Sequence, residues 1–270
     1  MRRVRRVAIA GPVSAALIAS SCAGGASPPD AVSVDAVSVG ATWQLQLQGD
    51  VDTSHDADVY DIDLFDVPVE TIDALHTDGR TVICYFSAGS WEQWRDDADG
   101  FADDAIGEPL VGWEGERWFD IRHDSVRDGL VARMDLAVTK GCDGVDPDNV
   151  TGYDTDTGYD LTADDQLDFN RFLAREAHDR NLLVGLKNDL AQIPELVDDF
   201  DFAVNEQCHE FDECGAMQPF LDAGKPVFNV EYLERFVADP DEVCDASRAR
   251  RIATLILPLA LDGDFRIACD

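Results

Sequence analysis

Two short acidic segments contain the residue types that cleavage of a glycosidic bond requires. They are Asp146-Pro-Asp-Asn149 and Asn205-Glu-Gln-Cys208. Such cleavage uses two carboxyl groups: one protonates the leaving oxygen, and the other attacks the anomeric carbon or activates a water molecule. Either aspartate of the first segment can supply one group and Glu206 the other, with Glu231 as a competitor for the acid. Each segment alone is also typical of a turn or of a solvated strand end, so their placement in the fold must decide.

Eight short apolar or β-branched runs recur along the chain, separated by helical or loop stretches. Runs of this length, bounded by polar residues and glycines, are typical of buried strands. They are Trp43–Leu47, Val59–Asp63, Thr81–Phe86, Gly144–Asp148, Leu182–Leu186, Asp201–Asn205, Pro226–Val230 and Thr254–Pro258.

Helical patterns lie between several of these runs. The clearest covers residues 162–179, where Thr162 and Asp165 form a capping box with Asp in place of the usual Glu or Gln. Shorter ones follow the second and fifth runs. Eight strands alternating with helices predict a single α/β domain over residues 41–270, a (β/α)₈ TIM barrel. The alternative is a doubly wound open sheet, which normally has a glycine-rich phosphate loop after its first strand; the segment 48–50 is not such a loop.

Polar side chains gather at the C-terminal ends of the predicted strands, where the active sites of such barrels lie. One polar strand end means little, but six or seven that converge on one rim indicate a site. Lys187, which directly follows an apolar run, is expected to hold a catalytic carboxylate in its ionised form. The residues expected to bind substrate are Trp43, Gln44, Asp61, Asp63, Tyr85, Asp146, Asn149, Lys187, Asn188, Glu231 and Tyr232.

Aromatic rings are the second requirement of a sugar site, because the apolar faces of pyranose rings stack on them. Most tryptophans are core residues, so we expect only two or three of the available rings to line the cleft. The segment Trp113–Trp118 is expected both to pack and to contact substrate. The candidate rings are Trp43, Tyr85, Trp91, Trp94, Trp113, Trp118 and Tyr232.

The charge balance restricts the possible partners. The chain has 55 acidic and 21 basic residues, a formal net charge of −34, so it repels nucleic acid and favours a cationic partner such as an amino-sugar polysaccharide. A solvated acidic surface, as in a salt-adapted host, produces the same composition. We expect no cofactor and no metal, because the chain has no CxxC pair and its five histidines lack a ligand-like spacing.

The N-terminus is typical of an export signal. Four arginines within residues 2–6 precede a short apolar stretch, Val7–Ile18, which is too short to span a bilayer. Ala19-Ser-Ser-Cys22 resembles a bacterial lipobox, whose cysteine is lipidated and becomes the first residue of the mature chain. Ordinary signal cleavage and twin-arginine export are the alternatives. We therefore expect a signal peptide over 1–21, a flexible tether over 22–40, and a lipid-anchored or secreted protein.

Apart from the lipobox cysteine, the chain has six cysteines. An even set in an exported protein indicates three disulfides. One pair is close enough in sequence to close a loop, a second lies on strands that the barrel topology makes neighbours, and the third is the pair that remains. In that order, the expected pairs are Cys208 with Cys214, Cys84 with Cys142, and Cys244 with Cys269.

Eight segments match the sequence pattern of one enzyme family. They are Trp43–Gly49, Val59–Phe65, Ile83–Ser90, Trp113–Arg122, Lys140–Asn149, Gly185–Asn188, Phe202–Cys208 and Gly224–Tyr232. In this order they resemble the endo-α-1,4-polygalactosaminidases of glycoside hydrolase family 114, which also includes spherulin-4-like proteins. One departure is Val150-Thr-Gly152, where relatives commonly have Val-Asp-Gly; it spares both catalytic positions.

This resemblance implies a (β/α)₈ barrel that hydrolyses an α-1,4-linked, at least partly deacetylated galactosamine polymer by a retaining mechanism. It also implies that Asp148 is the nucleophile and Glu206 the acid and base, which leaves Asp146 as a substrate-binding or tuning residue. We expect a monomer. The alternatives are a non-catalytic carbohydrate-binding barrel, a hydrolase of another α-linked sugar such as a galactoside, and a structural surface protein.

Overall fold

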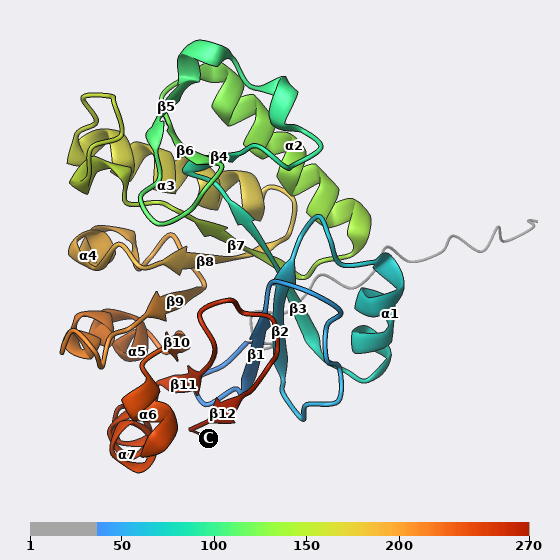
Figure 1. Ribbon diagram of the computed structural model, residues 1–270, viewed down its shortest axis with the longest axis vertical. Coiled ribbons are helices and arrows are strands. Elements are labelled where there is room, and N and C mark those ends of the chain that lie inside the picture. The colour runs from blue at the N-terminus through green and yellow to red at the C-terminus, as the bar shows by residue number, and fades with distance from the viewer. Residues whose placement is uncertain (1–36, 270) are drawn as a thin grey trace, which may run out of the picture. The chain divides into compact units, whose positions relative to one another are not determined.

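A computed structural model describes residues 37–269, which are organised around one sheet of nine strands (Figure 1). The strands follow each other across this sheet in chain order, and all neighbours are parallel except the last pair. The predicted signal peptide, Cys22 and most of the tether lie outside the described residues. In order, the strands are β1 (Trp43–Gln46), β2 (Val59–Asp63), β3 (Thr81–Ser87), β7 (Gly144–Asp148), β8 (Leu183–Lys187), β9 (Phe202–Glu206), β10 (Val227–Glu231), β11 (Ala253–Ile256) and β12 (Ile267–Ala268).

The eight predicted strands are confirmed as β1, β2, β3 and β7 to β11. They curl so that β1 and the C-terminal segment lie beside each other (Figure 1). Within residues 37–269 no backbone ladder joins these two edges. Instead, Arg266 Nη2 donates to the Trp43 carbonyl at 2.8 Å, and the Leu47 amide donates to the Leu261 carbonyl at 3.0 Å. The fold is therefore α/β with a curled, mostly parallel sheet. A closed barrel would have a continuous backbone ladder at this seam, and here individual hydrogen bonds bridge it.

Helices surround the curled sheet (Figure 1). The helix predicted at 162–179 is confirmed as α3, and its capping box is present: the Asp165 amide donates to Thr162 Oγ1 at 3.1 Å, and the Thr162 amide donates to Asp165 Oδ2 at 2.9 Å. In the described part of the chain, no helix is long and apolar enough to cross a membrane. The helices are α1 (Val69–Thr77), α2 (Asp124–Lys140), α3 (Ala163–His178), α4 (Ile193–Leu196), α5 (Gln218–Asp222), α6 (Glu234–Ala238) and α7 (Asp241–Arg250).

The segment between β3 and α2 forms a small antiparallel sheet that the strand pattern does not predict. It consists of β4 (Ser90–Glu92), β6 (Glu116–Phe119) and β5 (Ile106–Pro109), in that spatial order. The long helix α2 is also absent from the sequence prediction, because the fully buried Arg133 interrupts its apolar spacing. Since β4 begins just after β3 ends, this small sheet starts at the C-terminal edge of the large one.

Alternate residues of the parallel strands point into the curl. There Trp43, Ile83, Phe202 and Phe228 belong to one buried cluster, and the rings of Trp43 and Phe228 lie 5.0 Å apart. Gly185 of β8 has no room for a side chain in this layer, because an added Cβ would collide with the Phe202 ring. The apolar interior therefore fills the curl beneath the strand ends and leaves the layer above it to polar residues.

All three predicted disulfides are present. The first joins β3 to the residue two positions before β7, the second closes the loop after β9, and the third joins α7 to the end of the described chain. Each links segments that border the sheet, so a lost bond releases an edge of the structure that positions the strand ends. The pairs are Cys84–Cys142, Cys208–Cys214 and Cys244–Cys269.

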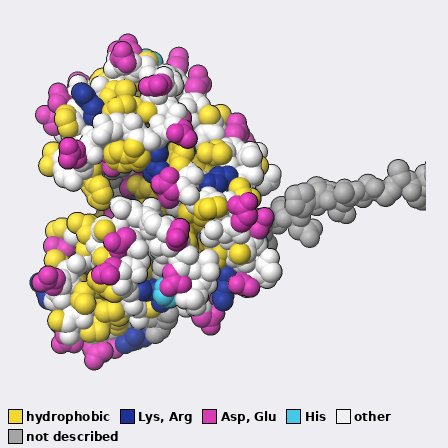
Figure 2. Space-filling view, turned by 45° about the vertical axis from the view of Figure 1, so that its right-hand side comes forward, with side chains coloured by type: hydrophobic (Ala, Val, Ile, Leu, Met, Phe, Trp, Pro, Cys, Tyr) yellow, Lys and Arg dark blue, Asp and Glu magenta, His cyan; other side chains and the backbone are white. Residues whose placement is uncertain are grey.

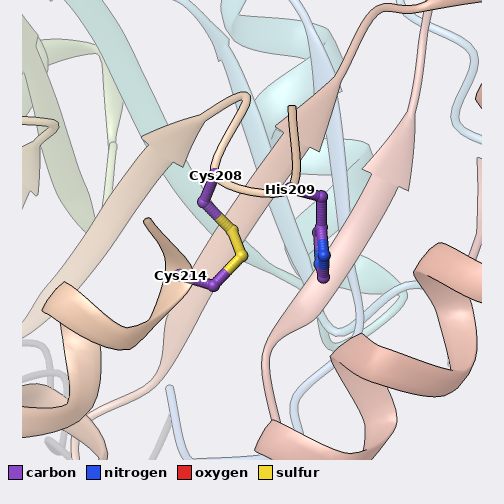
Figure 3. Close-up of side chains that lie close together, drawn as sticks. All are labelled: Cys208, His209 and Cys214. Carbon is purple, nitrogen blue, oxygen red and sulfur yellow. A yellow bond between two sulfur atoms is a disulfide. The ribbon is translucent and has the colours of Figure 1, made fainter. Parts of the chain in front are cut away.

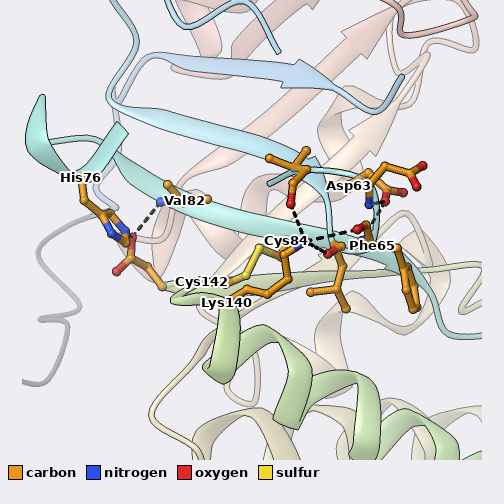
Figure 4. Close-up of a disulfide and its surroundings, with 11 residues drawn as sticks. Asp63, Phe65, His76, Val82, Cys84, Lys140 and Cys142 are labelled. Carbon is orange, nitrogen blue, oxygen red and sulfur yellow. Dashed lines mark hydrogen bonds and ion pairs between the residues drawn. A yellow bond between two sulfur atoms is a disulfide. The ribbon is translucent and has the colours of Figure 1, made fainter. Parts of the chain in front are cut away.

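Lys140 lies beside the first of these disulfides (Figure 4). Its ammonium donates hydrogen bonds to the carbonyl oxygens of Leu64, Phe65 and Val67. Burial lowers its pKa, although Asp63 opposes this effect. The last residue of α2 thus holds the turn that follows β2.

Candidate active site

A cleft of about 560 Å³ opens at the C-terminal ends of the parallel strands. Because the strands are parallel, the residues that end β2, β3 and β7 to β10 reach the same edge of the sheet. The cleft brings together both predicted catalytic carboxylates and six of the residues predicted to bind substrate. These residues are Asp63, Tyr85, Asp148, Asn149, Lys187, Asn188, Glu206 and Tyr232.

Lys187 lies between the carboxylates of this region. Its Nζ is 3.5 Å from Asp148 Oδ1, 3.7 Å from Asp146 Oδ2 and 3.9 Å from Glu206 Oε2. Burial by itself lowers the pKa of an amine, but the surrounding carboxylates outweigh this effect and the pKa of Lys187 is raised. Lys187 is therefore an ammonium at neutral pH, and this one cation lies close to both Asp148 and Glu206.

Asp148 ends β7 with both carboxylate oxygens held. Oδ2 accepts a hydrogen bond from the Tyr85 hydroxyl at 2.9 Å, and Oδ1 accepts one from the Asn149 amide at 2.7 Å. Burial, followed by the charge of Asp148, raises the pKa of Tyr85 well above its ordinary value, so this hydroxyl remains a donor. The Asp148 side chain is 19% exposed. A carboxylate held in this way suits attack along one fixed direction.

Glu206 ends β9 and is more exposed than Asp148, at 29% of its side chain. The Tyr232 hydroxyl donates to Oε1 at 2.5 Å, and Asn188 Nδ2 donates to Oε2 at 3.1 Å. Asn188 Oδ1 also accepts from the Glu206 amide at 2.9 Å, so this amide side chain holds both the backbone and the carboxyl of its neighbour. A carboxyl that is oriented but open to the cleft can exchange a proton with a ligand.

Asp61 and Asp146 lie one layer deeper. Both are buried and neither lines the cleft, so the prediction that they contact substrate disagrees with their depth in the sheet. None of their four oxygens has a hydrogen-bond partner of standard geometry among the described residues. Burial raises the pKa of both carboxyls, and the negative charge of Asp146 raises that of Asp61 further. The Lys187 ammonium, 3.7 Å from Asp146, opposes this shift without cancelling it, so burial favours a protonated carboxyl in the pair.

Three other residues predicted to bind substrate do not reach the cleft. Trp43 is buried in the cluster inside the sheet, and Gln44, its neighbour on β1, is buried on the opposite face. Glu231 is fully buried; its Oε1 accepts from the His209 amide at 2.8 Å and from Asn229 Nδ2 at 3.1 Å. Successive side chains of a strand alternate between its faces, so the neighbour of an inward residue is directed away from the cleft.

The small antiparallel sheet supplies cleft residues that the strand-end argument misses. Arg95 Nη2 donates to Asp63 Oδ2 at 2.7 Å, and it also lies 2.9 Å from Glu92 Oε1. All three residues line the cleft. Asp63 is therefore an ion-pair partner, and the charge that it presents to a ligand is largely balanced by this arginine.

The segment Trp113–Trp118 packs against the fold at one end and reaches the cleft at the other. Trp118 is buried, whereas Trp113 is 48% exposed and lines the cleft, as does Trp94 at 50% exposure. Glu116 accepts a hydrogen bond from Ser90 Oγ at 2.7 Å, and burial raises its pKa to about 7. The same segment therefore supplies Glu116, another carboxyl group of the cleft wall.

The turns that follow β7, β8 and β9 have an uncommon backbone. Asn149, Asn188, Asp189 and Gln207 have φ angles of 62°, 51°, 44° and 64°. Residues other than glycine rarely adopt positive φ, and Asn and Asp tolerate it best. Each of these residues comes directly after, or one residue beyond, a strand-end side chain of the cleft. The strain therefore sits where the chain must turn away at once from a functional residue.

Asp189 fastens one of these turns to α3. It is buried, and its Oδ2 accepts a hydrogen bond from Asn170 Nδ2 at 2.8 Å; Asn170 Oδ1 in turn accepts from Gln166 Nε2 at 2.9 Å. Burial raises the pKa of Asp189 to about 7. A buried network on α3 thus supports the turn that carries Lys187 and Asn188.

One cluster of possible metal ligands lies in the loop after β9. The ligand atoms of Cys208, His209 and Cys214 lie within 4.8 Å of one another. Figure 3 shows the two cysteines joined in a disulfide, and a disulfide sulfur is not the thiolate that binds metals. His209 Nε2 lies 2.7 Å from Ser247 Oγ. The cluster therefore closes a loop and offers no thiolate ligands.

Comparison with known proteins places the chain in a family. The sequence model of glycoside-hydrolase family GH114 matches residues 25–270. The chain belongs to this family. It is also similar to the crystal structure of Aspergillus fumigatus Ega3 in complex with galactosamine, with a TM-score of 0.82 and 43% identity over 86% of this chain and 96% of that one.

A second solved structure shares the fold of this GH114 chain. The glycoside hydrolase domain of PelA from Pseudomonas aeruginosa has a TM-score of 0.67 and 14% identity over 84% of this chain and 98% of that one. No curated protein matches the sequence. Family membership makes the protein a glycoside hydrolase.

Replacing Asp189 by Asn in this GH114 hydrolase should change how its stability depends on pH. Because the pKa of Asp189 is raised in the folded state, the folded protein binds more protons than the unfolded one between the two pKa values. The free energy of unfolding therefore decreases as pH rises toward 7, by up to about 1.4 kcal/mol per pH unit from this group. The free energy of unfolding of Asp189→Asn, relative to that of the parent, should increase from about pH 5 to pH 7 and then stay constant.

This difference can be measured by denaturant unfolding of both proteins over the same pH series. Asp73→Asn, an exposed aspartate on α1, is the matched control and should show a constant difference. A constant difference for Asp189→Asn as well would contradict a raised pKa at this position.

Proposed function

We propose that this protein is an exported, endo-acting hydrolase of an α-1,4-linked, galactosamine-containing polysaccharide with a retaining mechanism. The observation that supports it best is the pair Asp148 and Glu206 at one cleft, both facing Lys187. The chain is 43% identical to Ega3, whose structure contains galactosamine. In this proposal Asp148 is the nucleophile and Glu206 the general acid and base.

The reaction then takes two steps. Glu206 donates its proton to the glycosidic oxygen while Asp148 attacks the anomeric carbon; the glycosidic bond breaks and an ester between sugar and Asp148 forms. Glu206, now a carboxylate, next takes a proton from a water molecule whose oxygen attacks the same carbon, which breaks the ester and restores both residues. Tyr85 and the Asn149 amide orient the nucleophile, and Tyr232 and Asn188 orient the acid.

The spacing of the two carboxylates is compatible with this mechanism. Their nearest oxygens are separated by at most the sum of their distances to Lys187 Nζ, which are 3.5 and 3.9 Å. This limit admits the separation of about 5–5.5 Å that is typical of retaining enzymes and also the lower part of the inverting range, which begins at about 6.5 Å, so the anomer of the product decides between the two. Lys187 faces both groups, so the same ammonium lies beside the negative charge when it is on Asp148 and when it has moved to Glu206.

The charge around the cleft supports a cationic substrate. Its lining includes six carboxyl groups against two cations, Lys187 and Arg95, and acidic side chains are spread over the face seen in Figure 2, with few basic ones. Protonated galactosamine units would be attracted to this surface, and the attraction would weaken at high salt. The carboxyl groups are Asp63, Asp66, Glu92, Glu116, Asp148 and Glu206.

The test is an assay of the purified protein on a de-N-acetylated galactosamine polymer. The parent should release oligosaccharides, whereas Asp148→Asn and Glu206→Gln should each lose at least about a hundredfold in rate. Asp73→Asn and Glu70→Gln, the same exchanges at exposed positions of α1, should behave like the parent. Observation of the first-formed product by NMR should show the α-anomer.

Three outcomes would separate the parts of the proposal. No release by the parent, or faster cleavage of a neutral galactan, would overturn the substrate. Near-parent rates in either folded carboxylate variant would overturn the site. A first-formed β-anomer would overturn the retaining mechanism and leave the other two parts intact.

We also propose that residues 1–21 are an export signal and that Cys22 carries a lipid anchor, with residues 22–40 as the tether of a monomeric enzyme domain. Support comes from the basic start, the short apolar stretch and the small residues before Cys22. Cys22→Ala should move the protein from the membrane fraction to the soluble fraction of the producing cells. Unchanged membrane association of Cys22→Ala would rule the anchor out, and Ser27→Ala, the exchange of another small residue between the signal and the domain, is the control.

A further inference from the structure

A second cleft, of about 490 Å³, borders the active-site cleft. It is formed by the turn after β2, the loop after β4 and one side of α2. Asp66, Trp94 and Arg95 line both clefts. Because the same three side chains form a wall of each, a ligand that leaves the active site past Trp94 enters the second cleft, which we name the side cleft.

The floor of the side cleft is built from a ring and two arginines. The guanidinium carbons of Arg95 and Arg133 lie 4.6 and 5.1 Å from the centroid of the Phe65 ring. Arg133 donates to Asp97 at 2.8 and 3.0 Å and to the Ser87 carbonyl at 2.6 Å. Since this arginine is engaged by its own neighbours, the floor is rigid and does not present a free cation to an anionic ligand.

Arg95 and Lys140, the other cations of the side cleft, are also engaged. Arg95 pairs with Asp63, and Lys140 donates to three backbone carbonyl oxygens of the turn after β2. At the rim, Asp96 is exposed, and Asp66 is 77% exposed although one of its oxygens lies 3.6 Å from Arg95 Nη1. The side cleft therefore offers carboxylates and apolar surface to a ligand, which suits a cation with apolar faces.

Trp94 stands at the junction of the two clefts with half of its surface exposed. Burial of the exposed part of this ring by a ligand would be favourable. Its flat apolar face matches the face of a pyranose ring, and the neighbouring carboxylates match amino groups on that ring. Trp113, the second exposed tryptophan, lines the active-site cleft alone, so Trp94 is the ring that marks the passage.

We propose that the side cleft extends the substrate-binding cleft and holds further units of the amino-sugar chain, with Trp94 as the stacking surface between the two parts. The inference rests on the proposed function. It adds a second binding region to that site, and it predicts that the enzyme cleaves long chains faster than short ones. Chains too short to pass Trp94 gain nothing from it.

The test compares kcat/KM on de-N-acetylated galactosamine oligomers of increasing length. Trp94 also lines the active-site cleft, so the measure is the difference between chain lengths: Trp94→Ala should lose about tenfold more in kcat/KM on long chains than on the shortest chain that is cleaved, which corresponds to a stacking contact of about 1.4 kcal/mol. Phe211→Ala removes an exposed ring outside both clefts and should match the parent at every length.

A blocking variant guards against a folding defect of Trp94→Ala. Ala132 is exposed on α2 and lines the side cleft alone, so Ala132→Trp should fill it and abolish the gain with chain length while short-chain rates stay at the parent level. An equal loss at all lengths, or no loss in either variant, would overturn the side cleft as a binding region. If the parent cleaves no oligomer at all, the proposed function has failed instead.

Discussion

Lys187 places one ammonium group among three carboxylates in a region where little water reaches, and the arrangement of the cleft depends on it. Asp146, Asp148 and Glu206 each have an oxygen within 3.9 Å of its Nζ. Like charges at such distances raise each other's pKa and push the side chains apart. A buried cation at the centre allows the carboxylates to stay close, which is the condition that two-carboxylate chemistry imposes.

The fold allows the charged groups to stay close because it places them in separate layers of the curl. Beneath Lys187 the curl is filled with apolar rings and Gly185, and the buried carboxyls of Asp61 and Asp146 occupy the layer between. Because burial favours a proton on that pair, the pair adds less than its formal charge, and Lys187 remains available to Asp148 and Glu206. Hydroxyl and amide donors on the adjacent strand ends then orient each carboxylate.

The sequence predicts the site residues that lie at strand ends, because the local pattern of apolar and polar residues shows where each strand ends. Apolar runs that end in or directly precede Asp148, Lys187 or Glu206 mark positions that a parallel sheet must bring to one edge. The same topology predicts the Cys84–Cys142 disulfide. Depth and side-chain direction are not local properties: Asp61 and Trp43 lie too deep, and Gln44 and Glu231 face away. Glu92 belongs to a small sheet whose strands are too short to be predicted from alternation, and Arg95 and part of the side cleft lie in the loop that follows its first strand.

The pH dependence of kcat/KM for Lys187→Met, compared with that of the parent on the same polymer, tests the central role of this lysine most directly. The variant, once shown to be folded, should be at least about a hundredfold slower at its optimum. The acidic limb of its profile should also move to higher pH, because the cleft carboxylates have lost their nearest cation. A folded Lys187→Met variant with the same rate and the same acidic limb as the parent would contradict the central role of Lys187.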